Sequence, residues 1–349
     1  MKKIMLIISL LVFNVNAIST SSYIVYNTNN DSILMGNNIH SPRLIASVSK
    51  ILTCIIAIEN SDINDTVTID LNTLKTTGSS LYLSLNEKIT MRDLLYGLML
   101  RSGNDAAIAI AYHVSGSMES FANLMNEYAK KIGMNDSIFY NSHGLELSNG
   151  LGNLSSPYDL ALLTKYAMKN PLFREIFQTK KYTCKTNMKT YHWTNKNKLL
   201  KYDYVKGGKT GYTLKAKRTL VTTGTVHNQE IVIVTLNDPN DFNDHNDIYN
   251  YLIDNYEYYK VLDQDIFLND LKHFNVVGNY YIKNNYYLFI NKKEKDNIEM
   301  EYHFNKDNKN GYVNILINKE LIHKEPMFLK EKEDNWFKKL LNRFLNFFK

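Results

Sequence analysis

The chain has 349 residues, of which 44% are hydrophobic and 22% charged, and this balance excludes an intrinsically disordered protein. Its length allows a large core and indicates two domains with short appendages. The net charge of +6 is mild, and we expect no nucleic-acid partner. Two cysteines are too few for a disulfide scaffold or a zinc ribbon, and the nine histidines form no metal-binding pattern. We therefore expect neither a metal site nor a cofactor.

The first residues have the pattern of an export signal. Lys2 and Lys3 precede an apolar run from 4 to 13, and a small residue, Ala17, ends the segment. These features are typical of a cleaved signal peptide, here over residues 1–17. The alternative is an uncleaved membrane anchor, but the run is shorter than the ~20 residues that a spanning helix needs. The pattern predicts a protein that works outside the cytoplasmic membrane.

Alternating and helical patterns follow in chain order. Segments 22–26 and 33–35 predict one β-hairpin, and segments 218–223 and 231–235 predict a second. The apolar period predicts helices over 47–59, 91–100, 105–113, 118–132, 157–168 and 244–259. Strands at both ends with helices between them predict an α/β (α+β) domain. We expect an antiparallel sheet whose terminal strands meet, flanked by helices, with a helical subdomain inserted.

The composition changes near Asp263. From 276 to 329 the chain is rich in Tyr, Ile, Val and Asn in short alternating stretches, which predicts a small β domain over 263–330 after a first domain over 18–262. In 336–348 apolar residues recur on one helical face, with basic residues largely off it. This pattern predicts an amphipathic helix over 331–349 that lies on a membrane surface. The alternatives are a helix docked on the protein's own core and an oligomer contact.

Two further features are weaker signals. The acidic run from Asp238 to Asp244 loosely suggests a calcium loop, but it lacks the glycine and the terminal glutamate of an EF-hand. A loop that caps the following helix is the better interpretation. Cys54 stands among isoleucines and a leucine and is interpreted as a core thiol, with a bridge to Cys184 as the less favoured alternative.

Three short elements carry the chemistry when they are taken together. Ser47 and Lys50 are one helical turn apart, so their side chains can meet. Alone, such a serine is ordinarily a helix cap. Ser102-Gly103-Asn104 stands between two predicted helices, and Lys209-Thr210-Gly211 leads into the second hairpin. The order Ser-x-x-Lys, Ser-x-Asn and Lys-Thr-Gly is similar to the set shared by serine β-lactamases and penicillin-binding proteins.

The resemblance extends over nearly the whole chain that follows the signal. Segments 77–81, 94–98, 141–145 and 208–213 are similar to signatures of the D-alanyl-D-alanine carboxypeptidases, and the order of domains is similar as well. These enzymes are low-molecular-mass penicillin-binding proteins of serine peptidase family S11, sporulation-type members included. The resemblance implies the penicillin-binding, β-lactamase-like transpeptidase fold.

The catalytic roles follow from the resemblance and from side-chain chemistry. Ser47 is the expected nucleophile, with the free N–H groups of a helix start beside it. Its hydroxyl needs a base, and Lys50 can serve only while it is neutral. Burial and a second cation, Lys209, would both lower the pKa of Lys50. Ser102 is expected to relay a proton between Lys50, Lys209 and the leaving amine.

Several residues beyond the nucleophile are expected to contact the substrate. Asn104 offers an amide to the substrate backbone. Lys209 and Thr210 are expected to meet the terminal carboxylate, and Gly211 lets the peptide lie against the strand edge. The backbone N–H groups of Ser47 and Tyr212 would form an oxyanion hole, whose donors are typically worth ~3 kcal/mol each.

One stretch and two single residues near the motifs affect the expected substrate contacts. Some relatives have an arginine after the last sheet strand that helps to bind the substrate carboxylate, whereas this chain has the acidic stretch 237–240. Arg218 is a candidate substitute. His143 is expected to stabilise its loop and to stay out of the chemistry.

The resemblance implies a serine-type carboxypeptidase that removes the terminal D-alanine from peptidoglycan pentapeptide stems through an acyl-serine intermediate. Such an enzyme contributes to cell-wall synthesis and cell shape, and β-lactams inhibit it. Its expected place is the outer face of the cytoplasmic membrane, in the periplasm or the cell-wall space. A serine β-lactamase is the alternative within the same chemistry, with Glu146 as the candidate base for water. A non-catalytic peptidoglycan-binding scaffold is the alternative of another class, and the intact motifs disfavour it.

Overall fold

The computed structural model of the protein describes residues 18–264, 280–305 and 310–329. The chain divides into two units, and the division falls after Asp254. Each unit has its own hydrophobic core. All three chemical motifs lie in the first unit, which carries the α-helices of the described residues.

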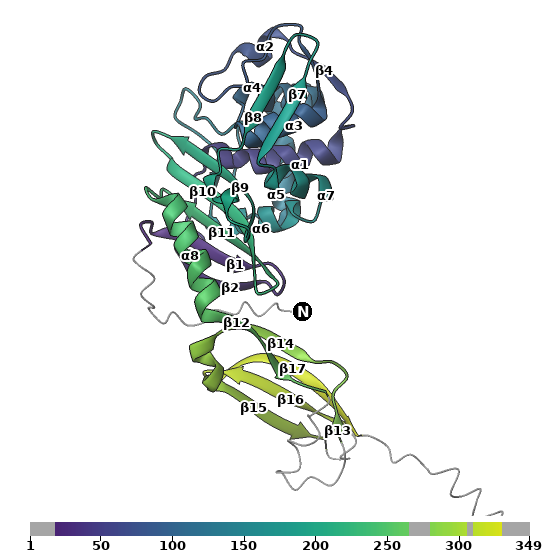
Figure 1. Cartoon of the computed structure of the whole chain (residues 1–349), viewed down its shortest axis with the longest axis vertical. Helices are drawn as coiled ribbons and strands as arrows, with labels where there is room; N and C mark the ends of the chain where they lie inside the picture. Colours follow the sequence, from purple (N-terminus) through teal and green to yellow (C-terminus); the bar gives the residue numbers. More distant parts are fainter. Residues whose placement is uncertain (1–17, 265–279, 306–309, 330–349) are drawn as a thin grey trace, which may run out of the picture. The chain divides into compact units, whose positions relative to one another are not determined.

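A five-stranded antiparallel sheet organises the first unit, in the order β2-β1-β11-β10-β9 (Figure 1). Its strands are β1 (Ser22–Asn27), β2 (Ser32–Asn37), β9 (Val205–Thr213), β10 (Lys217–Val226) and β11 (Gln229–Leu236). β1 pairs with β11, so the terminal strands of the unit meet, as the sequence predicts. His227 and Asn228, with φ of 45° and 63°, form the two-residue turn between β10 and β11. Positive φ at both positions is the type I′ geometry that matches the twist of paired strands.

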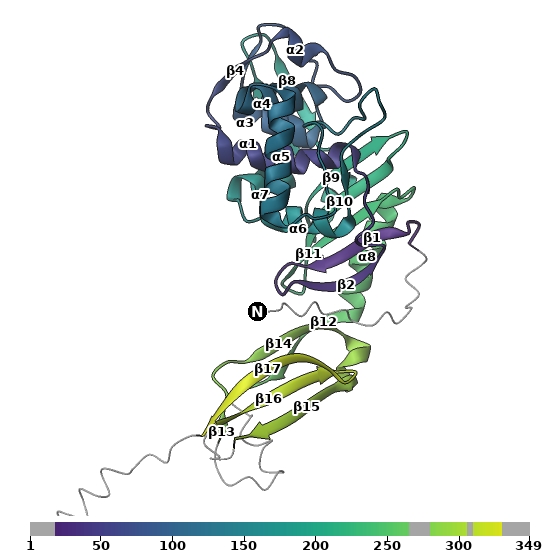
Figure 2. The same ribbon diagram turned by 180° about the vertical axis from the view of Figure 1, so that it is seen from behind.

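The two faces of the sheet pack against different helices. Because alternate residues of a strand point to opposite faces, Val221 and Val234 join the main core, whereas Thr222 and Thr235 hydrogen-bond His245 of α8 (Asp241–Asn255). On the core side, α6 (Pro157–Ala167) packs against β1 and β11, and α7 (Pro171–Gln178) packs against β9. Figures 1 and 2 show α8 and α6 on opposite sides of the sheet.

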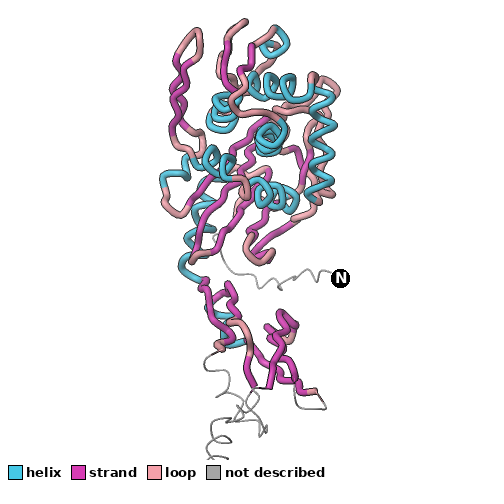
Figure 3. The backbone as a smooth tube through the Cα atoms, turned by 90° about the vertical axis from the view of Figure 1, so that its right-hand side faces the viewer, coloured by secondary structure: helices cyan, strands magenta, loops and turns pink. Residues whose placement is uncertain are grey.

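A helical subdomain surrounds α1 (Lys50–Asn60), which is buried from Lys50 to Ala57. Figure 3 shows the helices of the first unit in cyan beside its strands in magenta. A helix that is apolar on all sides belongs in the centre of a core. Its neighbours include α3 (Met91–Leu100), α4 (Asn104–Ser115) and α5 (Met118–Ile132). The other elements are α2 (Leu71–Leu74), η2 (Lys198–Lys201) and the strand pairs β3 (Arg43–Leu44) with β6 (Leu154–Ser155), β4 (Thr66–Thr68) with β5 (Lys88–Thr90), and β7 (Lys181–Lys185) with β8 (Thr190–Thr194).

Side-chain caps explain where several of these helices begin. Thr90, Ser117 and Ser156 each accept a hydrogen bond from the backbone N–H three residues on, at the starts of α3, α5 and α6. Such a cap satisfies one of the N–H groups that a helix start leaves without a partner. These caps account for the close agreement between the predicted and observed helix starts at 91, 118 and 157.

Two predicted helices differ from the structure. The helix predicted from 47 begins at Lys50, because Ala46–Ser49 forms a 3-10 turn, η1. The helix predicted to reach 259 ends at Asn255, and Tyr256–Leu262 is the strand β12. Its tyrosines and valine favour a strand over a helix. The sequence analysis also missed α7 and the β7–β8 hairpin, which are short elements.

The described residues of the second unit form a small β structure. β12 pairs with β14 (Tyr286–Asn291), and β13 (Tyr280–Tyr281), β17 (Glu320–Leu329), β16 (Asn310–Ile317) and β15 (Ile298–Phe304) form a four-stranded antiparallel sheet in that order. A 3-10 helix, η4 (Lys292–Asn297), follows β14. Because β12 pairs with β14, the division lies at 254–255 rather than at the predicted 262–263.

The predicted signal peptide (1–17) and amphipathic helix (331–349) lie outside the described residues. Among the helices of the described ranges, none has the length and hydrophobicity needed to span a bilayer.

Candidate active site

Ser47 lies in η1, the turn that leads into α1. Lys50 Nζ lies 3.0 Å from Ser47 Oγ, within hydrogen-bonding distance. Ala46, just before the serine, has φ +46°, a conformation that L-residues seldom adopt. The Ala46 carbonyl accepts a hydrogen bond from Ser49 Oγ over 2.8 Å, which helps to hold this turn. The turn therefore brings together the serine and the lysine that the sequence predicts as a pair.

Lys50 is completely buried among oxygen acceptors. Besides Ser47, its Nζ contacts Asn104 Oδ1 at 2.8 Å and the His143 carbonyl oxygen at 2.5 Å. Burial lowers the pKa of Lys50 well below its usual value, and the charges of Lys209 and Lys196 lower it further, against a smaller opposing effect of Asp105. The low pKa makes the neutral amine accessible, which is the form that can accept a proton from a hydroxyl.

Lys209 and Ser102 face each other on the other side of the site. Lys209 Nζ donates a hydrogen bond to Ser102 Oγ over 3.0 Å and another to the Thr210 carbonyl over 2.6 Å. Burial and the charge of Lys196 lower the pKa of Lys209 to about 7. Ser102 is buried and has φ +63°, an unfavourable conformation that aims its hydroxyl toward the lysine. The second and third motifs thus meet through these two side chains.

The strand edge at Gly211 runs close past the nucleophile. A Cβ at this position would lie 2.4 Å from Thr219 Oγ1, 3.0 Å from the Ile45 carbonyl oxygen and 3.1 Å from the backbone nitrogen of Ser47. Only a glycine permits this approach without displacing backbone atoms. Thr210 is half-buried beside it, and the next side chain, Tyr212, is 58% exposed. The backbone of β9 and the backbone of Ser47 therefore lie side by side, as an oxyanion hole built from both would require.

Asn104 already uses both ends of its amide group within the protein. Its Oδ1 accepts from Lys50, and its Nδ2 donates to the Thr77 carbonyl over 2.6 Å. Its backbone N–H donates to the Ser79 carbonyl over 2.8 Å. In the described structure Asn104 therefore positions the lysine and the loop 76–84, and its predicted contact with a substrate backbone stays a prediction.

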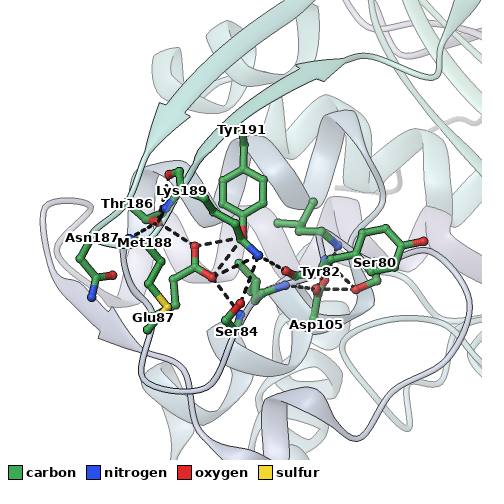
Figure 4. A network of polar contacts seen from close by, with 12 residues as sticks. Ser80, Tyr82, Ser84, Glu87, Asp105, Thr186, Asn187, Met188, Lys189 and Tyr191 are labelled. Atoms are coloured by element: carbon green, nitrogen blue, oxygen red, sulfur yellow. Dashed lines mark hydrogen bonds and ion pairs between the residues drawn. The ribbon is translucent and has the colours of Figure 1, made fainter.

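The loop 76–84 is held in place by two buried carboxylates. Asp105 accepts hydrogen bonds from Ser80 Oγ and from the backbone N–H groups of Leu81 and Leu83. Glu87 accepts from the Ser84 N–H over 2.8 Å and binds side chains of the β7–β8 hairpin, as the contacts in Figure 4 show. Those hairpin contacts are Thr186 Oγ1, Tyr191 Oη and, at 3.7 Å, Lys189 Nζ. The loop that contacts Asn104 is thus tied to a hairpin distant in sequence.

The loop 141–145 packs against the backbone of Ala46, the residue just before the nucleophile. Gly144 has φ +89°, and a Cβ there would lie 1.9 Å from the Ala46 carbonyl oxygen. Asn141 Oδ1 accepts a hydrogen bond from the Gly144 N–H over 2.7 Å. His143 is half-buried next to Lys50, and loss of solvation, with a smaller effect of the Lys50 charge, lowers the pKa of its ring to about 3. His143 therefore meets the site through its carbonyl, with a neutral ring.

Sequence analysis missed Lys196, a third cation of the site. Its Nζ donates to Ser79 Oγ over 2.8 Å, and its charge lowers the pKa of both Lys50 and Lys209. Burial and Arg101 lower its own pKa as well. The residues Asn195-Lys196-Asn197-Lys198 form an ordinary polar stretch, so no local signal marks this position.

Two side chains that the sequence suggested for substrate binding or for activating water form hydrogen bonds within the protein instead. The Arg218 guanidinium donates to Asp241 Oδ1 from both Nε and Nη2, over 3.0 and 2.7 Å, so the suggestion that it replaces the substrate-binding arginine is not supported. Glu146 Oε1 accepts from Thr213 Oγ1 over 2.5 Å. Glu146 lines a surface hollow together with Lys75, Thr77 and His143.

Comparison with known proteins agrees with this geometry. Residues 12–240 match the model of the peptidase S11 family, described as D-alanyl-D-alanine carboxypeptidase. The chain is similar to the D-alanyl-D-alanine carboxypeptidase DacF of Bacillus subtilis, with 32% identity over 209 residues that cover 58% of this chain and 53% of that protein. It is also similar to the D-alanyl-D-alanine carboxypeptidase of Streptomyces sp. strain K15, with 36% identity over 52% of this chain and 68% of that protein.

Solved structures resemble the fold over different lengths. A mutant of the Streptomyces K15 DD-transpeptidase has a TM-score of 0.63 at 31% identity, covering 67% of this chain and 97% of that one. The carboxypeptidase DacD of Francisella tularensis has a TM-score of 0.74 and covers 95% of this chain and 96% of that one, but at 21% identity it supports the fold alone. The family match covers most of the chain and includes all three motifs. The chain belongs to the D-alanyl-D-alanine carboxypeptidase family of serine peptidases, family S11.

Proposed function

We propose that this protein is an exported serine-type D-Ala-D-Ala carboxypeptidase that removes the terminal D-alanine from peptidoglycan pentapeptide stems. The observation that carries the proposal is the contact of 3.0 Å between Ser47 Oγ and the buried Lys50 Nζ, whose pKa is well below that of an ordinary lysine. A primary amine with a lowered pKa beside a serine hydroxyl is an arrangement for nucleophilic catalysis. The proposed roles of Ser102, Asn104, Lys209, Thr210, Gly211 and Tyr212 are those expected from the sequence.

In the proposed acylation step, neutral Lys50 accepts the Ser47 hydroxyl proton as Oγ attacks the carbonyl of the penultimate D-alanine. The backbone N–H groups of Ser47 and Tyr212 stabilise the oxyanion. The bond to the last D-alanine then breaks, and its amine leaves with a proton delivered through Ser102 and Lys209. Protonated Lys209 and the Thr210 hydroxyl bind the terminal carboxylate. Hydrolysis of the acyl-Ser47 ester by water completes the cycle.

A β-lactam would acylate the same serine, because its strained amide presents a carbonyl at the same place. We favour the carboxypeptidase over a β-lactamase, since the one acidic residue considered as a water-activating base, Glu146, already accepts a short hydrogen bond from Thr213. Slow hydrolysis of the penicillin ester follows from this assignment.

The place of action is part of the proposal. We propose export with removal of residues 1–17, a catalytic domain that begins at 18, and peripheral attachment to the outer face of the cytoplasmic membrane through 331–349. Support comes from the charge and hydropathy patterns of those segments. Cell fractionation of the full chain and of a chain ending at residue 330 tests the attachment: the proposal requires release of the shorter form into the soluble fraction.

The activity is tested with purified protein and a pentapeptide ending in D-Ala-D-Ala. We expect release of D-alanine and a penicillin adduct that peptide mass spectrometry maps to Ser47. Ser47→Ala and Lys50→Ala should lose both, whereas Ser120→Ala, an exposed serine on α5, should keep both. Release of D-alanine by Ser47→Ala at the wild-type rate would contradict the proposed nucleophile. Rapid turnover of penicillin would favour the β-lactamase.

A further inference from the structure

Two buried carboxylates fasten the start of the described chain to the beginning of α8. The Ser19 N–H donates to Asp244 Oδ2 over 2.6 Å. Ser19 Oγ lies 2.5 Å from Asp238 Oδ1 and 2.8 Å from Asp244 Oδ2. Figures 1 and 2 show the start of β1 next to the N-terminal end of α8. Because a serine hydroxyl has one hydrogen, it can donate fully to only one of these two acceptors.

No lysine or arginine of the described residues forms an ion pair with these two carboxylates. Asp238 is completely buried and Asp244 is 6% exposed. Within the described ranges Asp238 Oδ2 is buried without a hydrogen-bond partner. Arg218, whose backbone carbonyl accepts from the Asp238 N–H, has its guanidinium paired with Asp241. Burial raises the pKa of Asp238, the Ser19 hydroxyl and the Asn240 N–H lower it, and the charge of Asp244 raises it again. Two adjacent buried acids without a counter-charge are costly.

We propose that the α-ammonium group of Ile18, created when the signal peptide is cut after Ala17, binds Asp238 and Asp244 and supplies the missing charge. The cut is a hydrolysis by a signal-cleaving peptidase of the export machinery: water adds across the Ala17–Ile18 peptide bond, leaving a carboxylate on the released segment and an ammonium group on Ile18. This inference rests on the proposed export and cleavage. It requires no change in the catalytic residues.

Backbone geometry places the new ammonium group within reach. Nitrogens of consecutive residues lie about 3 Å apart, because only Cα and one carbonyl carbon separate them. The Ser19 nitrogen lies 2.6 Å from Asp244 Oδ2, so the Ile18 nitrogen lies within about 6 Å of that carboxylate. In the uncut chain this nitrogen is a neutral amide with one N–H. After the cut it carries a positive charge and three N–H donors, which suits the acceptors that Ser19 alone cannot satisfy.

The contact would make the folded state sensitive to processing. Asp238 directly follows β11, and its backbone N–H donates to the Arg218 carbonyl of β10 over 2.9 Å. An ammonium group bound here ties the start of β1 to the ends of β10 and β11. The processed chain is therefore more stable than a chain that keeps residues before Ile18, and the precursor is less tightly folded before export.

The test compares three forms of the chain, all ending at Lys349. One begins at Ile18 with a free amine, one keeps Asn16 and Ala17, and one begins at Ile18 with an acetylated amine. We expect the free form to melt about 2–4 °C above the other two, which should melt together. Asp244→Asn should abolish this difference, and Asp247→Asn, on the same helix, should preserve it. Equal melting of all three wild-type forms would overturn the inference.

A second readout does not depend on melting. An ammonium group bound to two carboxylates is harder to deprotonate than a free α-amine, whose pKa is about 7.7–8.0. Amine-reactive labelling of Ile18 near neutral pH should therefore be slower in the wild type than in Asp244→Asn, and equal rates would argue against the contact. Penicillin acylation at Ser47 should persist in every form, so its loss points to failure of the proposed function instead. A mature protein from the secreting host whose intact mass shows a first residue other than Ile18 also overturns the inference.

Discussion

Three lysines share the catalytic site, and their mutual repulsion influences which of them is neutral. Lys50 and Lys209 are buried, and Lys196 lies at their edge with its ammonium group on Ser79 Oγ. Replacing Lys196 by glutamine removes a positive charge that lowers the pKa of both. Their pKa values should rise, so less Lys50 is neutral at a given pH. We expect the acidic limb of the acylation rate to move to higher pH by up to about one unit.

The measurement is the rate of labelling by a fluorescent penicillin as a function of pH. Lys198→Gln is the matched control, because Lys198 is two residues away and exposed. If Lys196→Gln is labelled more slowly but the acidic limb of its pH profile stays at the same pH, Lys196 acts only by holding the loop at Ser79.

Arg218 provides a second test at the residue scale. Its guanidinium pairs with Asp241, whose side chain is 3% exposed while that of Arg218 is 41% exposed. Arg218→Gln leaves a buried carboxylate without its partner, and we expect a loss of about 1–3 kcal/mol in the free energy of unfolding. The KM for the pentapeptide should change by less than about twofold, since binding energy is lost only where a contact with substrate is removed. Urea unfolding and steady-state kinetics measure the two effects, and a large rise in KM at unchanged stability would restore Arg218 as a substrate ligand.

At this scale, the sequence was sufficient for residues that stand in a motif and insufficient for residues that act across loops. Ser47 and Lys50 could be paired because helical spacing places them on one face. Lys209 could be proposed as the second cation because its motif was recognised. Lys196 reaches the site only through the fold of the segment after β8, and the Asp241 partner of Arg218 lies 23 residues further along the chain.

Among the elements, the loop 141–145 and the turn η1 are packed backbone against backbone. Gly144 and Gly133 both have φ near +90°, at +89° and +90°, but only at Gly144 would an added Cβ have atoms within 4 Å. Gly133→Ala should cost about 1–2 kcal/mol for the unfavourable conformation alone. Gly144→Ala should cost more than ~4 kcal/mol, because the methyl group would overlap the Ala46 carbonyl.

Denaturant unfolding compares the two variants, and penicillin labelling reports the site. Gly133→Ala should acylate at the wild-type rate. If any Gly144→Ala remains folded, displacement of Ala46 should slow its acylation. Equal stability losses for the two alanine variants would show that the close approach to Ala46 is unimportant.

The elements themselves were predicted best where local chemistry decides them. The caps Thr90, Ser117 and Ser156 mark helix starts in the sequence, and His227-Asn228 marks a turn. The 3-10 turn at Ala46–Ser49 could not be foreseen, because its positive φ is imposed by packing from the loop 141–145 and from β9. Similarly, the β7–β8 hairpin depends on Glu87, a residue almost a hundred positions earlier that its side chains bind.

For the whole molecule, two histidines with lowered pKa values predict sensitivity to acid. His245 hydrogen-bonds Thr222 and Thr235, and burial lowers its pKa to about 3, as it does for His143. In the unfolded chain a histidine titrates near 6.5, so below that pH the unfolded state binds a proton that the native state excludes. Above pH ~6.5 this effect should leave the free energy of unfolding unchanged. As the pH drops from there toward 3, the free energy of unfolding should fall by about 1.4 kcal/mol per pH unit for each histidine.

Urea unfolding at a series of pH values measures this slope. His245→Gln should make it shallower by about 1.4 kcal/mol per pH unit, whereas His192→Gln, at an exposed position of β8, should leave it unchanged. A slope that His245→Gln does not alter would mean that carboxylates alone determine the acid response.

At the scale of the whole molecule, composition predicted a β-rich second unit. Its first strand was predicted as part of a helix, because pairing between β12 and β14 depends on residues about thirty positions apart.

The two cysteines have a practical consequence under the proposed export, which would expose the folding chain to an oxidising space. Both are free and buried, and burial raises the pKa of Cys54 far above that of a free thiol and the pKa of Cys184 to about 12. Thiols that stay protonated and covered do not react with oxidants or with each other. The folded first unit therefore contains no disulfide between Cys54 and Cys184. Because a buried thiol can be alkylated only when unfolding exposes it, the alkylation rate of these cysteines measures how often the native unit unfolds locally or globally.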